Sequence, residues 1–212
     1  RSFHVTGVQT CALPIFDSTG KITEIGNGDP VADFADIEEE LNMWYQKILE
    51  VNRDKLQKIL KTNNDSITAL TELYQGIGVK KFHVKDALKA TNLEDKDLEN
   101  FSIQDSKKFS TYLRKISKPT LIVANKIDVP NADKNFHRLR ERYNDMIIVP
   151  ASADSELTLR RAEQKGLIKY SPGSEQFEIL KDDDLNDKQK DALDFIKKDI
   201  MGEYMRTGVQ FA

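Results

Sequence analysis

The spacing of apolar residues changes along the chain and separates helix-like from strand-like stretches. From Val31, apolar side chains recur at alternating steps of three and four, and acidic residues fill the early turns, where they favour the helix dipole. This pattern predicts an unusually long amphipathic helix that continues through Leu60 and suggests a projecting coiled coil. Its apolar positions are Phe34, Ile37, Leu41, Trp44, Ile48, Leu56, Ile59 and Leu60.

Residues 55–118 have the pattern of an all-helical insertion. Ser66 is expected to cap a helix that ends at the glycines of Gly76-Ile-Gly78. The returning helix carries Phe109 and ends before Pro119, because a residue that precedes proline disfavours the helical conformation. The sequence therefore predicts helices that leave and return to a larger domain.

Two short apolar runs after this insertion predict buried strands. The first follows Pro119 and ends in Asn125-Lys126-Ile127-Asp128; the second is Met146–Pro150, which leads into Ala151-Ser152-Ala153. A helical pattern over residues 131–143 lies between them. Strand, helix and strand in this order predict an α/β domain with polar residues at the carboxyl ends of its strands, where open α/β sheets bind ligands.

Two more helices are expected near the end of the chain. Asp154 or Ser155 is placed to cap a helix from Glu156 to Lys165, which Gly166 terminates. The last helix runs from Asp187 to about Tyr204.

The side chains of Asn125, Lys126 and Asp128 suit a guanine base. The Asp128 carboxylate only accepts hydrogen bonds, so its oxygens match the adjacent N1–H and N2–H donors of guanine, whereas adenine has no such pair. Lys126 can lay its alkyl stem over the base, and Asn125 can tie the loop to its neighbours. The alternative interpretation is an ordinary polar loop in which Asp128 starts a turn before Pro130.

Asn125-Lys126-Ile127-Asp128 and Ser152-Ala153 resemble the fourth and fifth guanine-recognition motifs of P-loop GTPases. In such G domains the Ser-Ala turn offers a backbone N–H to the guanine O6, and this donor rejects adenine, whose exocyclic amine is also a donor. Asp154 departs from the pattern, since many GTPases carry Lys there.

Further segments resemble the archaeal branch of the YchF (Obg-like) GTPases, from about Asp17 to Gln210. They are Gly28-Asp-Pro-Val31, Ile116-Ser-Lys-Pro119, Glu156-Leu-Thr-Leu-Arg-Arg-Ala162 and Thr207-Gly-Val-Gln210. The resemblance implies the C-terminal half of a P-loop-type G domain with a partly parallel sheet and a helical, coiled-coil-like insertion. It also implies GTP or GDP as ligand, association with the translation machinery, and Mg²⁺ only in the intact protein.

The phosphate-binding motif of this family is not in the sequence. No Gly-x-x-x-x-Gly-Lys-[Ser/Thr] segment occurs, so no glycine-rich loop, lysine or Mg²⁺-binding hydroxyl of that kind is available. The resemblance places these groups upstream in an intact GTPase. We therefore expect this fragment to contain no catalytic or metal-ligating residue and not to hydrolyse nucleotide.

Composition limits the environment of the chain. A net charge of -3 and a pI near 5.7 give no global attraction to nucleic acid or to an anionic membrane. No apolar run approaches the length of a membrane span. The single Cys11 cannot form an internal disulfide, and no Cys/His spacing suggests zinc, so a cytoplasmic protein is expected.

The insertion nevertheless has a local surplus of basic residues. Such clustering is what contact with RNA or a ribosome requires, although lysines on solvated helix faces are also ordinary. This leaves a non-enzymatic helical adaptor that binds RNA or protein as the alternative function. Glu38-Glu39-Glu40 is interpreted as a solvated helix face. The basic residues are Arg53, Lys55, Lys58, Lys61, Lys80, Lys81, Lys85, Lys89, Lys107, Lys108, Arg114, Lys115 and Lys118.

These observations predict six segments. Residues 1–16 do not match the family and resemble translated sequencing-adapter read-through, so they are expected to be an artefactual or non-homologous leader. The others are a G-domain part at 17–54, the helical insertion at 55–118, a G-domain part with the guanine motifs at 119–170 and a helical segment at 171–206. The resemblance further implies that 207–212 is the start of a truncated TGS region, a small β-rich module.

Overall fold

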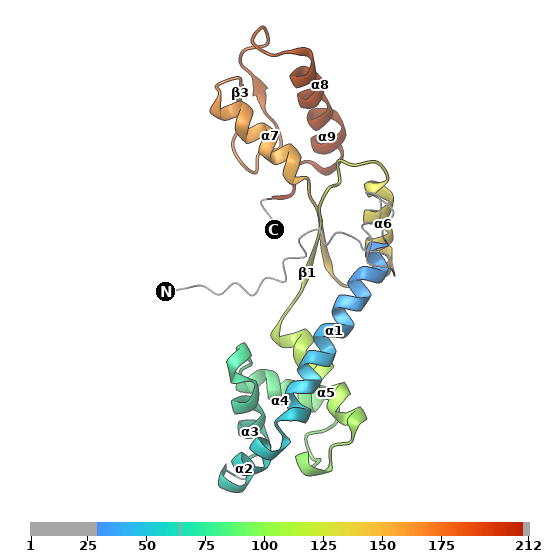
Figure 1. Cartoon of the computed structure of the whole chain (residues 1–212), viewed down its shortest axis with the longest axis vertical. Helices are drawn as coiled ribbons and strands as arrows, with labels where there is room; N and C mark the ends of the chain where they lie inside the picture. Colours follow the sequence, from blue (N-terminus) through green and yellow to red (C-terminus); the bar gives the residue numbers. More distant parts are fainter. Residues whose placement is uncertain (1–28, 64, 210–212) are drawn as a thin grey trace. The chain divides into compact units, whose positions relative to one another are not determined.

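The computed structural model describes residues 29–63 and 65–209, and these divide into two compact units (Figure 1). The helical unit is Ala32–Leu121, and the α/β unit comprises Arg1–Val31 and Ile122–Ala212. The predicted leader, the segment 17–28 and residues 210–212 lie outside the described residues. The domain boundaries predicted from the sequence remain predictions.

The helical unit is built from α-helices and short 3₁₀ turns around one apolar core that includes several aromatic rings. Tyr45 stacks on Tyr74 with ring centroids 5.8 Å apart, and the Tyr74 hydroxyl donates to the Tyr45 carbonyl at 2.8 Å. Phe109 meets Tyr74 edge-on. The elements are α1 (Pro30–Val51), α2 (Arg53–Asn63), α3 (Ser66–Tyr74), η1 (Gln75–Ile77), α4 (Lys81–Ala90), η2 (Leu98–Asn100) and α5 (Ile103–Ser117).

The long helix predicted from Val31 to Leu60 is interrupted at Asn52, where α1 ends and α2 begins. The Asn52 side chain donates to the carbonyl of Ile48 at 2.8 Å, a bond that competes with the helical backbone. Leu49 and Leu56, on either side of the break, are both buried in the core of the helical unit. The prediction of one continuous helix is therefore wrong at Asn52, and the structure does not confirm a coiled coil.

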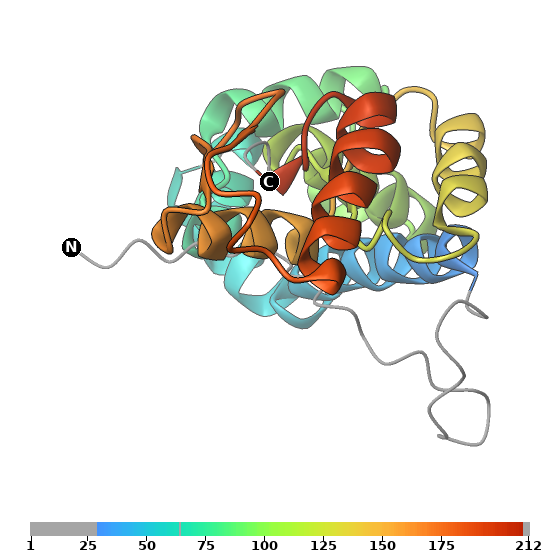
Figure 2. The same ribbon diagram turned by 90° about the horizontal axis from the view of Figure 1, so that it is seen from above.

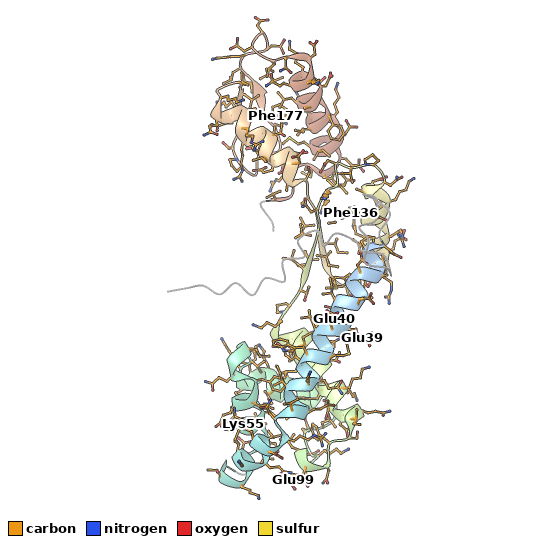
Figure 3. All side chains as sticks on the ribbon, in the orientation of Figure 1. Glu39, Glu40, Lys55, Glu99, Phe136 and Phe177 are labelled. Carbon is orange, nitrogen blue, oxygen red and sulfur yellow. The ribbon has the colours of Figure 1, made fainter. Side chains whose placement is uncertain are left out.

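A buried ion pair joins α5 to α1. Arg114 is only 5% exposed; its Nη2 lies 2.5 Å from Glu38 Oε2, and its Nε donates to Asn42 Oδ1 at 2.8 Å. The expected solvated face therefore holds for Glu39 and Glu40, which are exposed (Figure 3), but is wrong for Glu38. Arg114 likewise does not belong to the basic surface, because it is buried against α1.

Two predicted helix caps are displaced. Asp65, not Ser66, caps α3, with its Oδ1 accepting the N–H of Ile67 at 3.0 Å. Ser152, not Asp154 or Ser155, caps α7, which consequently begins at Ala153. In both places several adjacent residues have cap-forming side chains, and spacing alone does not choose among them.

The α/β unit contains the predicted strand, helix and strand, and the coarse α/β class is confirmed. The expectation that both strands are buried is wrong, because Leu121 and Ile147 are exposed and the other strand residues are half-buried. β1 pairs with β2 in a small parallel sheet, and β3 pairs with β4 antiparallel, with Ile168 opposite Ile179. The elements are β1 (Leu121–Ala124), α6 (Ala132–Arg142), β2 (Ile147–Pro150), α7 (Ala153–Gln164), β3 (Ile168–Lys169), β4 (Glu178–Ile179), α8 (Asp187–Phe195), a π-helical segment (Ile196–Ile200) and α9 (Met201–Tyr204).

Two apolar clusters stabilise this unit. In the first, here called the α7–α8 cluster, Phe177 (labelled in Figure 3) packs with Leu159 of α7 and Leu193 of α8. Figure 2 shows the ribbons of α7, in orange, and α8, in red, from above. The second, called the α6 cluster, joins Phe136 to Ile127 and Ile200. The run from α8 to α9 contributes to both, because Ile196 and Met201 face the first cluster and Ile200 faces the second.

Candidate functional site

The loop after β1 is held in place by its least polar residue. Ile127 is 7% exposed and packs on Phe136, and its N–H donates to the Ala151 carbonyl at 3.1 Å. Its neighbours are less covered: Asn125 and Lys126 are exposed and Asp128 is half-buried. Burial of Ile127 therefore fixes the loop to the core and leaves the three predicted polar side chains at the surface.

Lys126 has an unusual backbone conformation. Its φ is +65°, in the left-handed region that non-glycine residues rarely adopt, and its carbonyl accepts the N–H of Val129 at 3.1 Å. Strained conformations of this kind persist where the surrounding structure determines them, and they occur often at binding sites. Here the buried Ile127, which follows Lys126, and the hydrogen bond from the Val129 N–H to the Lys126 carbonyl hold Lys126 in this conformation.

Ser152 connects the two sequence motifs. Its Oγ accepts the N–H of Ser155 at 3.1 Å, as the cap of α7, and donates to Asp128 Oδ1 at 2.6 Å. A hydroxyl has one proton and two lone pairs, so one side chain can perform both tasks. Ser152 is fully buried. The residue that starts α7 therefore also sets the orientation of the Asp128 carboxylate.

A second bridge runs in parallel. The N–H of Ala153 donates to Asn125 Oδ1 at 3.1 Å. Residues Asn125, Asp128, Ser152 and Ala153 are thus brought together as predicted, and Lys126 lies in the same loop. A purine oxygen that accepted the Ala153 N–H would have to share it with Asn125 or replace Asn125 as acceptor.

This arrangement can recognise a polar, flat ligand edge. Asp128 Oδ1 receives one hydrogen bond from Ser152, and the carboxylate has further lone pairs for other donors. The amino end of α7 lies beside it, and helix amino ends carry partial positive charge that favours electron-rich ligand atoms. An acceptor and a donor are therefore presented close together, which is the combination that a base edge requires.

Membrane-spanning and metal-binding features are absent from the part of the chain that the structure describes. Within residues 29–63 and 65–209, no helix is long and apolar enough to cross a membrane. The same residues contain no group of three or more His, Cys, Asp or Glu side chains arranged to hold a metal ion.

Sequence reasoning did not assign a structural role to Glu156 or Thr207. Glu156 is 3% exposed and accepts bonds from the Thr207 and Tyr170 hydroxyls, both at 2.7 Å, and from Arg160 Nε at 2.6 Å. Burial alone would raise the pKa of Glu156, but the bonds from Thr207, Tyr170 and Arg160 outweigh it and keep this pKa below its ordinary value. Burial and the bond to Glu156 raise the pKa of Tyr170 to about 12.

Comparison with known proteins identifies similar sequences and one similar fold. Residues 123–212 match the family described as Obg-like GTPase YGR210-like, G4 motif-containing domain. An uncharacterized GTP-binding protein of Methanocaldococcus jannaschii is 35% identical over 200 residues, which are 92% of this chain and 49% of the relative. Another, from Schizosaccharomyces pombe, is 31% identical over 170 residues, 78% of this chain and 40% of that protein.

A solved structure extends the comparison to the fold. The crystal structure of a GTP binding protein from Pyrococcus horikoshii OT3 matches with a TM-score of 0.70 and 32% identity, over 94% of this chain and 52% of that one. The chain therefore spans about half the length of the relatives that it matches.

Proposed function

Because these similarities support an Obg-like GTPase family, we propose that the chain is a guanine-recognising portion of an archaeal-type YchF GTPase. Asn125, Lys126, Asp128, Ser152 and Ala153 form the base site. The observation that carries this proposal is the 2.6 Å bond from Ser152 to Asp128, together with the Ala153–Asn125 bond, because these contacts hold the two motifs at one surface.

Recognition follows from the hydrogen-bonding edge of the base. Asp128 accepts from N1–H and N2–H of guanine, and the apolar stem of Lys126 covers one face of the ring. The Ala153 N–H donates to guanine O6, either while it also donates to Asn125 or after its bond to Asn125 has broken. Adenine has an amine where guanine has O6, so it would place a donor against the Ala153 N–H. It also has an unprotonated ring nitrogen where guanine has N1–H, and this nitrogen would face the Asp128 carboxylate. Two contacts would therefore be lost.

Properties of the whole protein are proposed on the resemblance alone. The curated relatives are named GTP-binding proteins, and the chain covers 49% and 40% of their lengths. We assign GTP hydrolysis with Mg²⁺, association with the translation machinery and a cytoplasmic location to the intact protein. The first of these requires a phosphate-binding loop, which this sequence does not contain.

A second candidate function, binding of RNA through the helical unit, is favoured by one open groove. The groove has a volume of about 600 Å³ and lies between the end of α4 and α5. Lys107, Lys108 and Lys115 line it, and Tyr112, which is 37% exposed, supplies a ring on which a base can stack. Cationic side chains can bind phosphates while the aromatic ring stacks on a base. A single-stranded nucleic acid therefore fits this groove better than a protein partner with a flat surface does.

The guanine proposal is tested by Asp128→Asn. The substitution replaces an acceptor with a mixed donor and acceptor, so preference for GDP over ADP should fall and xanthosine diphosphate, which has an oxygen in place of the 2-amino group, should compete better. Binding is measured by competition against a fluorescent guanine nucleotide. Asp133→Asn, on α6 and exposed, is the matched control. A parent chain without guanine preference, or an unchanged preference in Asp128→Asn, would overturn the proposal.

A further inference from the structure

The segment Thr207–Val209 lies against the turn that joins β2 to α7. The backbone N–H of Ser152 donates to the Thr207 carbonyl at 2.8 Å, and both residues are fully buried. Ser152 is also the residue that orients Asp128. A segment 55 residues away in the sequence, counted from Ser152 to Thr207, therefore contacts the proposed base site directly.

Gly208 shows how close this contact is. Its φ is +79°, and a Cβ atom at this position would lie 1.8 Å from the Pro150 carbonyl oxygen and 2.9 Å from Ala151 Cα. No side chain fits into such a space, and the left-handed conformation separately favours glycine. The backbone of residue 208 is thus pressed against the end of β2, and any larger residue must push the segment away.

The side chain of Thr207 makes a second attachment. Its hydroxyl donates to Glu156 Oε2 at 2.7 Å, and Glu156 lies on the first turn of α7. Thr207 consequently holds α7 at two points: the carbonyl binds the cap residue Ser152, and the hydroxyl binds Glu156. Because Glu156 also accepts from Tyr170, it fixes the Thr207 hydroxyl within a buried network.

We propose that Thr207 is a positioning residue for guanine selectivity, acting through Ser152 on the carboxylate of Asp128. The inference rests on the proposed function and extends it to the segment 207–209. Three contacts transmit the effect: Glu156 holds the Thr207 hydroxyl, the Thr207 carbonyl holds the Ser152 N–H, and the Ser152 hydroxyl holds Asp128. Whatever displaces the segment loosens the orientation of Asp128 and lowers discrimination between guanine and adenine.

The test compares Thr207→Val, which keeps the shape but removes the hydroxyl, with Thr207→Ser, which keeps the hydroxyl. Two readouts are taken on the full chain: the ratio of GDP to ADP affinity, and amide hydrogen exchange at Ser152 and Ile127. We expect Thr207→Val to speed exchange at Ser152 about tenfold, as loss of one net hydrogen bond implies, and to lower the affinity ratio several-fold. Thr207→Ser should restore both.

Controls separate selectivity from general destabilisation. Thr158→Val, on the same helix but outside the network, should leave both readouts at the parent values. Thr207→Ala replaces Thr207→Val if circular dichroism shows that the latter does not fold. An unchanged affinity ratio in a folded variant without the hydroxyl overturns the inference, even if its melting temperature falls, because Thr207 would then be structural only.

The exchange readout distinguishes failure of this inference from failure of the proposed function. A parent chain that shows no guanine preference overturns the function and with it the role of Thr207 in selectivity. Exchange at Ile127 is measured without nucleotide, so it tests the mechanical link by itself. Faster exchange at both amides in Thr207→Val supports the link, and unchanged exchange at both overturns it.

Discussion

The Ser152 hydroxyl donates a 2.6 Å hydrogen bond to Asp128 Oδ1, across 24 residues of sequence. The Ser152 hydroxyl oxygen also accepts the N–H of Ser155 and so caps α7. A helix cap and a candidate ligand-binding carboxylate are therefore oriented by one side chain. Stability of α7 and binding at Asp128 should respond together when this side chain is changed.

Ser152→Ala should lower the free energy of unfolding by about 2 to 3 kcal/mol, since it removes a helix cap and a hydrogen bond to a charged group. Guanine affinity should fall as well. Chemical denaturation and nucleotide titration measure the two effects. Ser171→Ala, in an exposed turn, should stay within about 0.5 kcal/mol of the parent.

A double-mutant cycle with Asp128→Ala shows whether these effects share one contact. If Ser152 acts through Asp128, the losses of guanine affinity in the two single variants will not add in the double variant. Additive losses would contradict the structural relationship.

Arg114→Leu should destabilise the helical unit by about 3 kcal/mol. The substitution leaves the half-buried Glu38 carboxylate without its cation, and such breaking of a buried pair is costly. Adding Glu38→Leu should recover part of the loss, because two apolar residues can fill the space. Lys107→Leu, at an exposed position on the same helix, is the control, and urea denaturation is the measurement. Equal effects at positions 114 and 107 would refute the importance of the buried pair.

Acid stability should depend on Glu156. Its pKa is lowered in the folded state, so the stability it contributes is fully present above its ordinary pKa of 4.5 and is lost as pH falls through the lower folded value. Glu156→Gln should be less stable than the parent at pH 7 and should show a shallower loss below about pH 4.5. Thermal melting from pH 7 to pH 3 measures this difference, with the exposed Glu163→Gln as control. Parallel profiles for parent and Glu156→Gln would contradict it.

Binding of single-stranded RNA should depend on the groove residues if the second candidate function holds. Lys107→Glu with Lys115→Glu should weaken binding and reduce the dependence of log K on log salt by about 1.4, for two lost phosphate contacts. Fluorescence anisotropy at several salt concentrations gives both values. Lys55→Glu with Lys58→Glu makes the same charge change on α2, and an equal effect there would show diffuse attraction without a groove-specific site.

Periodicity and motif spacing were sufficient to predict the elements around the site. The strand before Asn125, the helix that contains Phe136 and the strand before Ser152 are all present, because each is short, regular and bounded by residues that stop it. The proximity of Asp128 to Ser152 was also expected, because the resemblance assigned both motifs to the recognition of one guanine base. Their binding role remains a proposal.

The contacts that sequence reasoning missed are polar and distant in the chain. Nothing in the pattern around Glu38 distinguishes a residue that pairs with Arg114 from its exposed neighbours Glu39 and Glu40 (Figure 3). Likewise, one partner of Glu156 is Thr207, 51 residues away. Such pairs depend on how helices pack, and local patterns do not contain that information.

The π-helical turn at Ile196–Ile200 makes one backbone run common to two cores. Ile196 and Met201 are buried in the α7–α8 cluster, whereas Ile200 is buried with Phe136 in the α6 cluster. Unfolding of either cluster would expose apolar side chains of this run, although Lys197, Lys198 and Asp199 within it are already exposed. We therefore expect the α/β unit to unfold in a single cooperative transition. The residues around the Asp128 loop should then resist local opening as well as α9 does.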